Sequence, residues 1–519
     1  MTKGLSESKK SVLIILLVFL LTNFLIRGPD LFKYLNKPPN KWYTGQASWF
    51  DPWDHNVYFS AIGWGKRDSL LLANLYDTTA DKSLFIYTLY TIIGKIFSWS
   101  NYSNAFIFHL NGIIFSLILL TVIWWFIGLF LKEIWQKLFS FLIISVGGGL
   151  GWILFPQVQT PDVSQPGFIL ESALRHPHES ISLSLFFLSV GIFWLWGKTK
   201  KNKYLVFTFI LSFFMSFFHP YSLLTIGVVL AVFVFYKFLQ IKKNNLLLGL
   251  SCVISSGIVW YILIGRTLVG NPSFSGLLSQ VQSSPTPLMV VLGWGIIFPL
   301  TVAGLVSKST VDEINFLKIW FIVGWLIIYL PFGFQRLLIK GLWIPTVLLA
   351  TFGIKKISKE KIYLFIRLSG IVLVFVSFSL IYTAAKRITE TETNRWIYLT
   401  KEEGEIINYL NQHGDNEEGV LASYRIANII PAVTKKRVWA GHNFQTPQFK
   451  IRINEVDKFF TGLLEEKEAE TFINKTKTVW VFFGPDEQLI NKTNGLNYGF
   501  LKPIINKDNV TLYKITASL

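Results

Sequence analysis

Long apolar runs recur along the first 382 residues of the chain. A helix rises 1.5 Å per residue and the hydrocarbon core of a bilayer is about 30 Å thick, so about 20 apolar residues can cross it. The pattern predicts an α-helical polytopic membrane protein with about eleven transmembrane helices, several short enough to need flanking aromatic residues. The predicted spans are residues 11–26, 104–131, 138–155, 181–196, 204–218, 221–236, 246–264, 288–306, 316–330, 337–353 and 362–382.

The region after residue 383 follows a different pattern. It is polar overall, and short β-rich apolar runs alternate with amphipathic stretches. This alternation predicts a C-terminal soluble α/β domain over residues 384–519. Helices are expected at residues 401–413, 426–433 and 449–463, strands at 419–423, 437–441 and 478–483, and a hairpin at 497–515.

Residues 83–99 are apolar but contain Lys95, so this segment could cross the membrane or lie flat in its interface. If it does not cross, the lysine-rich loops all fall on the side of the basic N-terminal tail. If it crosses, every later loop changes sides. The positive-inside rule therefore favours a juxtamembrane helix, with the N-terminus in the cytoplasm and the C-terminal domain outside. This gives a transmembrane domain over residues 1–383, with a first outer loop at residues 27–82.

The composition supports a membrane protein. Of 519 residues, 51% are hydrophobic and only 15% are charged, which excludes an ordinary soluble protein and a disordered chain. The net charge of +18 would suggest nucleic-acid binding in a soluble protein. Here the predicted cytoplasmic segments hold 18 Lys and Arg against five acidic residues. The charge therefore reports topology, and nucleic acid is not expected as a partner. The richness in lysine and asparagine favours a bacterial plasma membrane.

The first outer loop contains candidate chemistry. Asp51 and Asp54 lie three residues apart among aromatic residues just outside the predicted membrane. An apolar surround tends to raise the pKa of a carboxyl group, which suits a general base. A carboxylate pair can equally bind a metal ion. For Asp51, which precedes Pro52, ordinary turn chemistry is an alternative.

The second outer loop ends in Arg175, His176, Pro177, His178 and Glu179. His178 and Glu179 are candidate ligands of a divalent metal ion. Pro177 argues against a regular helical pair of histidine ligands. Arg175 can bind a phosphate group through two hydrogen bonds.

Further candidates lie at the outer ends of spans. Five of the seven histidines, His55 and His219 among them, fall on the outer side, where they could surround one cavity or serve as interface anchors. Arg336 either extends to lipid headgroups or binds a substrate diphosphate. Glycines at residues 147–149 and 151 favour close helix packing over phosphate binding.

In this order, the motifs resemble the GT-C superfamily of integral membrane glycosyltransferases, which take sugars from polyprenyl-phosphate or polyprenyl-diphosphate donors on the outer membrane face. The acidic motif of residues 51–58, the juxtamembrane helix, the motif of residues 176–179 and the outer C-terminal domain follow the pattern of that superfamily. Bacterial members share further motifs with this chain. These are F-H-P-Y at residues 218–221, F-Q-R-x-L…P at 334–345, L-A-S…N-x-I-P-A at 421–432 and F-G-P-D-E at 483–487.

The resemblance implies a hexosyl- or pentosyltransferase in which Asp54 is the general base and Asp51 the alternate. It implies a polyprenyl-linked sugar donor, contact with membrane lipid, and a glycan, lipid or protein acceptor. His178 and Glu179 occupy the place of a second acidic pair, although His-Glu departs from Asp-x-Asp and leaves metal dependence open. Candidate substrate-binding residues are Arg336, Arg175, His219, His55 and Tyr58.

Two other classes of function fit a polytopic membrane protein. One is a transporter or flippase of lipid-linked solutes, although such proteins usually carry internal repeats and charged residues at mid-membrane. The other is a scaffold that keeps a GT-C fold without activity. Convergence of candidate residues in a cavity that reaches lipid would favour the enzyme.

Overall fold

The computed structural model describes residues 2–48, 51–67, 69–240, 246–272, 276, 280–359, 361–493 and 495–516. The chain forms two compact units. The first, here called the helical unit, comprises Met1–Pro29, Asn111–Leu263 and Val281–Lys386. The second, here called the sheet unit, comprises Asp30–Leu110, Ile264–Gln280 and Arg387–Leu519.

Each of the eleven predicted spans contains a helix. The helices that lie wholly or mainly in the helical unit are α1 (Thr2–Leu35), α4 (Asn104–Phe130), α5 (Ile134–Val146), α6 (Gly151–Leu154), α7 (Pro161–Ser164), α8 (Glu171–Arg175), α9 (Pro177–Thr199), α10 (Lys203–Phe218), α11 (Pro220–Gln240), α12 (Leu246–Trp260), η1 (Tyr261–Gly265), α15 (Pro287–Trp294), α16 (Ile297–Leu305), α17 (Asp312–Ile327), η3 (Gln335–Ile339), α18 (Trp343–Ile357) and α19 (Ile362–Thr389).

Fewer helices than predicted are long enough to span a membrane. Among the described residues, seven are long and apolar enough, or eight if α15 and α16 form one span bent by 101°. Helices α10 and α17 have 16 residues and α18 has 15. At 1.5 Å per residue such helices reach only about 24 Å, less than the hydrocarbon thickness. The structure therefore confirms a polytopic helical protein, and helix length alone supports seven or eight full spans among the described residues where the apolar runs predict about eleven.

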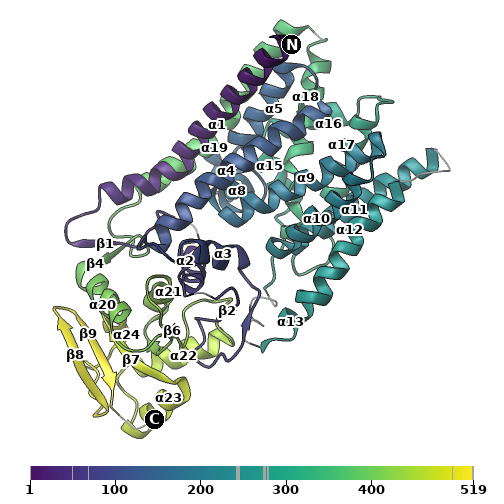
Figure 1. Ribbon diagram of the computed structural model, residues 1–519. Coiled ribbons are helices and arrows are strands. Elements are labelled where there is room, and N and C mark those ends of the chain that lie inside the picture. Colours follow the sequence, from purple (N-terminus) through teal and green to yellow (C-terminus); the bar gives the residue numbers. More distant parts are fainter. Residues whose placement is uncertain are drawn as a thin grey trace. The chain divides into compact units, whose positions relative to one another are not determined.

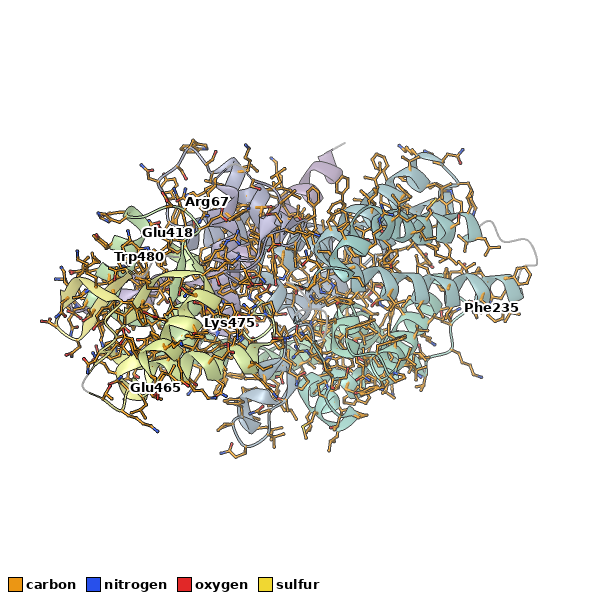
Figure 2. All side chains as sticks on the ribbon, turned by 90° about the horizontal axis from the view of Figure 1, so that it is seen from below. Arg67, Phe235, Glu418, Glu465, Lys475 and Trp480 are labelled. Atoms are coloured by element: carbon orange, nitrogen blue, oxygen red, sulfur yellow. The ribbon has the colours of Figure 1, made fainter. Side chains whose placement is uncertain are left out.

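Helices α9, α10, α11 and α12 pack side by side in the helical unit (Figure 1). Its core is aromatic, with Trp294, Trp320 and Phe186 among the fully buried side chains. Many apolar side chains remain exposed. Phe235 on α11, for example, is 61% exposed (Figure 2). An exposed apolar helix surface is typical of contact with lipid.

Glycines allow two segments of the helical unit to approach closely. A Cβ atom on Gly149 would lie 2.3 Å from the carbonyl oxygen of Gly293, so only glycine fits there. Asp162 in α7 secures the same turn, because its Oδ2 accepts hydrogen bonds from the backbone of Gly149 (2.9 Å) and Gly151 (3.1 Å) and from Ser379 Oγ (2.7 Å). The predicted packing role of these glycines is confirmed.

The sheet unit contains a five-stranded mixed sheet in the order β6-β5-β7-β9-β8 (Figure 1). Strand β5 is parallel to β6 and β7, whereas β9 is antiparallel to β7 and β8. The strands are β5 (Gly419–Leu421), β6 (Arg437–Val438), β7 (Thr478–Phe483), β8 (Leu501–Lys507) and β9 (Val510–Ile515). The accompanying helices are α20 (Lys401–Gln412), α21 (Tyr424–Val433), α22 (Phe449–Phe460), α23 (Glu466–Thr476) and α24 (Pro485–Ile490).

Both faces of this sheet are buried, as the alternation along β7 shows. Trp480 and Phe482 belong to the core that contains α20 and α21, whereas Val481 and Phe483 belong to the core that contains α22 and α23. Successive side chains of a strand point to opposite faces, which explains this division. Trp480 also donates its indole N–H to Glu418 (2.7 Å), and Figure 2 labels both residues. The predicted α/β domain is confirmed, and α23 and α24 add to the predicted elements.

The segment predicted as the first outer loop, residues 27–82, lies in the sheet unit from Asp30 onward. Strand β1 (Lys41–Tyr43) pairs antiparallel with β4 (Tyr398–Thr400), and helix α2 (Pro52–Gly65) packs against α21. The remaining elements of this unit are β2 (Leu72–Ala73), β3 (Ser83–Leu84), α3 (Thr88–Ile96) and α13 (Arg266–Val269). Helix α3 has nine residues and reaches about 14 Å, less than the hydrocarbon thickness of a bilayer. That residues 83–99 form a juxtamembrane helix stays a prediction. The domain boundary between residues 383 and 384 stays a prediction.

Candidate functional site

The two acidic residues of the first loop lie at the start of α2. Pro52 occupies the first helical position, where its missing N–H costs nothing. Asp51 is the N-cap residue and has a φ of +29°, a backbone region that residues with a side chain rarely adopt. Asp54 lies in the first turn. The D-x-x-D spacing thus places Asp51 in the turn and Asp54 on the helix.

Asp54 forms a hydrogen-bonded pair with a histidine from the C-terminal region. His442 Nε2 lies 3.0 Å from Asp54 Oδ1. The two partners differ in exposure, since 41% of the Asp54 side chain is exposed but only 2% of the His442 side chain. The carboxylate is therefore held from its buried side and remains open to a reactant.

Tyrosine hydroxyl groups surround this pair. Burial, together with the charge of Asp54, raises the pKa of Tyr424 to about 12 and that of Tyr87 further above its ordinary value. Gln445 Nε2 donates a hydrogen bond to Tyr87 Oη (2.7 Å). Tyr76, Tyr87 and Gln445 line a small hollow. These tyrosines are neutral at ordinary pH, so they contribute hydrogen bonds and no charge.

The candidate substrate-binding residues His55 and Tyr58 lie on α2 within an aromatic cluster. His55 is 3% exposed, and its ring lies edge-on to Phe108 with 5.6 Å between ring centroids. Tyr58 stacks on Tyr90 with a centroid distance of 4.8 Å. This aromatic packing explains how α2 is fixed within the sheet unit.

A second cluster of candidate residues lies in the helical unit, where α9 begins. His176 ends α8 and is the N-cap of α9, and Glu179 lies in the first turn of α9. The ammonium group of Lys340 contacts both the carboxylate of Glu179 and Nε2 of His219. His178 Nε2 lies 3.5 Å from Glu179 Oε1. The structure thus brings His178, Glu179 and His219 together around Lys340.

This cluster is nearly closed to solvent. The side chains of Lys340 and Glu179 are 6% and 12% exposed. His219 accepts a hydrogen bond from the Lys340 ammonium at Nε2. Its Nδ1 forms a second hydrogen bond with Ser222 Oγ (3.0 Å). Burial, together with the Lys340 charge, lowers the pKa of His219 to about 3. His219 is therefore a neutral acceptor at ordinary pH.

The candidate metal ligands do not fit a divalent ion in this arrangement. At Glu179 the Lys340 ammonium contacts Oε1, so a divalent ion would compete with this ammonium for that oxygen and meet its positive charge. His219, which could complete a ligand set, uses its Nε2 on the same ammonium group. Among the residues that the structure describes, no three His, Cys, Asp or Glu side chains are arranged to hold a metal ion. Lys340 supplies the positive charge in this cluster.

The two candidate arginines lie close in sequence to this cluster. Arg336 is in η3, four residues before Lys340, and its side chain donates hydrogen bonds to Gln282 Oε1. Arg175, at the end of α8, lies 3.9 Å from Glu171. Asp54 and Asp51 belong to the sheet unit and the arginine candidates to the helical unit.

Two residues of these clusters were not among the sequence candidates. Lys340 is one of the few basic residues in the predicted short outer loops, and that isolation is a usable signal in the sequence. His442 is one of many polar residues in the predicted α/β domain. Its partner lies 388 residues earlier in the chain, and no local pattern marks such a pair.

Comparisons with known proteins address the fold. A scan against protein-family models found no matching family, and a search of curated proteins found no matching sequence. Solved structures match with probability 1.00. The oligosaccharyltransferase of Archaeoglobus fulgidus, solved with a tethered acceptor peptide, has a TM-score of 0.57 at 12% identity and covers 91% of this chain and 68% of its own.

Two further solved structures are similar over almost the whole of this chain. ArnT from Cupriavidus metallidurans has a TM-score of 0.51 at 11% identity and covers 98% of both chains. The arabinofuranosyltransferase AftD from Mycobacteria has a TM-score of 0.54 at 11% identity and covers 98% of this chain and 40% of its own. All three are GT-C glycosyltransferases. The chain has the GT-C fold, a polytopic helical membrane domain with a soluble domain, as the resemblance of its motifs implies.

Proposed function

We propose that this protein is a membrane glycosyltransferase that moves a hexosyl or pentosyl group from a polyprenyl-phosphate or polyprenyl-diphosphate donor to an acceptor hydroxyl group. Asp54 is the general base. The reaction takes place on the extracytoplasmic face of a bacterial plasma membrane, with the N-terminus of the chain in the cytoplasm. The acceptor is a glycan, a lipid or a protein.

One observation carries this proposal. In a chain with the GT-C fold, Asp54 presents a carboxylate that is 41% exposed and is held by a hydrogen bond from the buried His442. A general base needs a carboxylate that is both fixed and accessible. Asp51, at the N-cap of α2, is the alternate base.

The chemistry requires a single displacement. Asp54 takes the proton of the acceptor hydroxyl group as its oxygen attacks the anomeric carbon of the sugar. The bond between that carbon and the donor phosphate oxygen breaks, and its electron pair leaves on the phosphate. The new glycosidic bond has the inverted configuration, the proton rests on Asp54, and the lipid carrier departs as its phosphate.

The basic residues of the helical unit suit the donor phosphate. Arg336 and Lys340 lie in and just after η3 and carry positive charge. Charge of this kind stabilises a leaving phosphate without the rearrangement that water would need. Glu179 and His219 hold the Lys340 ammonium in place. Arg175 is a further candidate contact for the donor phosphate. The reaction as proposed needs no metal ion, and neither His55 nor Tyr58 takes part in proton transfer.

The similar proteins support a lipid-linked donor. The Archaeoglobus fulgidus enzyme has been solved with dolichol-phosphate and an inhibitory peptide, and also with zinc and sulfate. A polyprenyl chain in the membrane and a polar acceptor in water match the division of this molecule into an apolar helical unit and a polar sheet unit.

The test is a transfer assay in proteoliposomes. The full-length protein is supplied with polyprenyl-phosphate hexose or pentose, labelled in the sugar, and with acceptor extracts that contain glycan, lipid or protein. We expect label to leave the carrier and appear in one acceptor class. If the label only moves across the bilayer while still joined to its carrier, the protein is a flippase. If wild-type protein neither transfers nor moves any donor, the proposal is wrong.

A further inference from the structure

The loop that carries His442 is closed on itself. Thr446 Oγ1 accepts hydrogen bonds from the backbone N–H groups of Gly441 (3.2 Å) and His442 (3.3 Å), and the Thr446 N–H donates to the His442 carbonyl group (2.8 Å). Thr446 Oγ1 also donates to the carbonyl oxygen of Tyr76 (3.1 Å). This bonding holds residues 441–446 in one conformation.

The same loop fixes the proton on the His442 ring. The backbone N–H groups of Phe444 (3.2 Å) and Gln445 (3.3 Å) both point at Nδ1. A backbone N–H only donates, so Nδ1 must keep its lone pair. The proton of the neutral ring therefore sits on Nε2, which lies 3.0 Å from Asp54 Oδ1. His442 donates and the Asp54 carboxylate accepts.

A second chain of hydrogen bonds joins the His442 loop to α2. Asn428 in α21 donates to the carbonyl oxygen of Gly441 (2.8 Å) and accepts from Asn56 Nδ2 (2.7 Å). Asn56 lies two residues after Asp54 on α2. The backbone of the loop and the backbone of α2 are thus tied together beside the Asp54–His442 pair, so the histidine cannot move without the helix.

We infer that His442 is a positioning residue, a buried N–H donor that orients the Asp54 carboxylate for proton abstraction. This inference rests on the proposed function, because it needs Asp54 to be the base. A hydrogen bond from a fixed neutral donor holds one carboxylate oxygen, and the exposed remainder of the group faces the acceptor. The histidine does not touch the substrate.

Other groups face Asp54 from the surrounding elements. Tyr76 follows β2, Tyr87 precedes α3, and Tyr424 begins α21, and the charge of Asp54 acts on all three hydroxyl groups. All three are neutral at the pH of an assay. His442 differs from them because its donor proton is fixed by the loop and points at the carboxylate.

Two substitutions separate the two sides of the ring. His442→Asn places an amide oxygen near the position of Nδ1, so it keeps an acceptor for the loop N–H groups but does not reach Asp54. His442→Gln extends an N–H group near the position of Nε2, so it keeps the donor to Asp54. If the donor matters, the two variants differ in activity although both shorten or replace the same ring.

We expect His442→Asn to lower kcat by roughly 10- to 100-fold, the value of a hydrogen bond to a charged group, and His442→Gln to restore most of that loss. The acidic limb of the kcat/KM profile should move to higher pH in His442→Asn, because the loss of a hydrogen bond to the charged form favours protonation of the carboxylate. In His442→Gln the limb should stay near the wild-type position. Thermal unfolding of each variant measures the folded fraction.

The outcomes separate this inference from the proposed function. If Asp54→Asn transfers sugar as wild type does, the proposed base is wrong. If Asp54→Asn is inactive but folded His442→Asn keeps wild-type kcat and the same acidic limb, His442 does not position the carboxylate. The inference is also overturned if folded His442→Gln is as inactive as His442→Asn. If His442→Asn fails to fold, the activity and pH profile of His442→Gln decide alone.

Discussion

The two carboxylate clusters of this protein use charge in opposite ways. The Glu179 side chain in the helical unit is 12% exposed and contacts the ammonium of the buried Lys340, whereas the Asp54 side chain in the sheet unit is 41% exposed and contacts the ring of His442. A buried charge must be compensated or the unit is destabilised, and a compensated carboxylate is a poor base. An exposed carboxylate that is oriented by a hydrogen bond stays accessible to the group that gives up its proton. The difference fits the proposed roles, in which the first cluster supplies structure and electrostatics and the second supplies the base.

The largest expected effect concerns the buried pair. Replacing Lys340 with methionine leaves the Glu179 carboxylate buried without its partner charge, and we expect a loss of about 3–5 kcal/mol in the free energy of unfolding. The matched control is Lys198→Met, which breaks the partly exposed ion pair with Glu313 and should cost about 1 kcal/mol or less. Denaturant unfolding in detergent measures both.

A double variant makes this result specific. In Lys340→Met combined with Glu179→Gln the buried charge disappears, so much of the lost stability should return. If Lys340→Met is no less stable than Lys198→Met, or if the double variant is no better than Lys340→Met alone, Glu179 does not depend on Lys340 for its charge.

A smaller effect concerns the pH dependence of stability. Since the pKa of His219 is lowered to about 3 in the folded protein, the unfolded chain binds a proton below pH 6.5 that the folded chain does not. The contribution of neutral His219 to the free energy of unfolding is complete above pH 6.5. It falls by up to about 1.4 kcal/mol per pH unit on acidification toward pH 3. His219→Gln should flatten this slope between pH 6.5 and 4. The exposed His413→Gln should leave it unchanged, and equal slopes in all three proteins would contradict the assignment.

The smallest expected effect is that of a chelator. Lys340 supplies the positive charge beside Glu179, so dialysis against a chelator should change neither the unfolding temperature nor the rate of sugar transfer. If the chelator lowers the unfolding temperature or the transfer rate, and zinc or manganese ions restore it, a metal ion and not Lys340 supplies the positive charge beside Glu179.

Local patterns predicted the apolar helices and most of the C-terminal sheet, but not α2, α23 or α24. Long apolar runs identified the helices, and the alternation that buries Trp480 on one face and Val481 on the other identified the sheet. The apolar runs predicted more spans than helix length supports, because several of them form helices of only 15 or 16 residues, such as α10, α17 and α18.

The pairings within the candidate site could not be predicted in the same way. Glu179 and Lys340 are 161 residues apart, and Asp54 and His442 are 388 apart. Such contacts follow from packing, which leaves no periodic signal in the sequence. The chemistry of individual residues was readable, since Asp54 and Glu179 were both singled out, but the partners that give each carboxylate its character were not.

In the proposed reaction, the exposed carboxylate of Asp54 is the base for sugar transfer. Its most direct test is the initial rate of labelled sugar transfer by Asp54→Asn and wild-type protein, compared at equal folded fraction. Asp508→Asn, which removes an exposed acid at the turn between β8 and β9, controls for the change in net charge. We expect a loss of about 10²- to 10⁴-fold for Asp54→Asn and none for Asp508→Asn. Equal rates for Asp54→Asn and wild type would contradict the account.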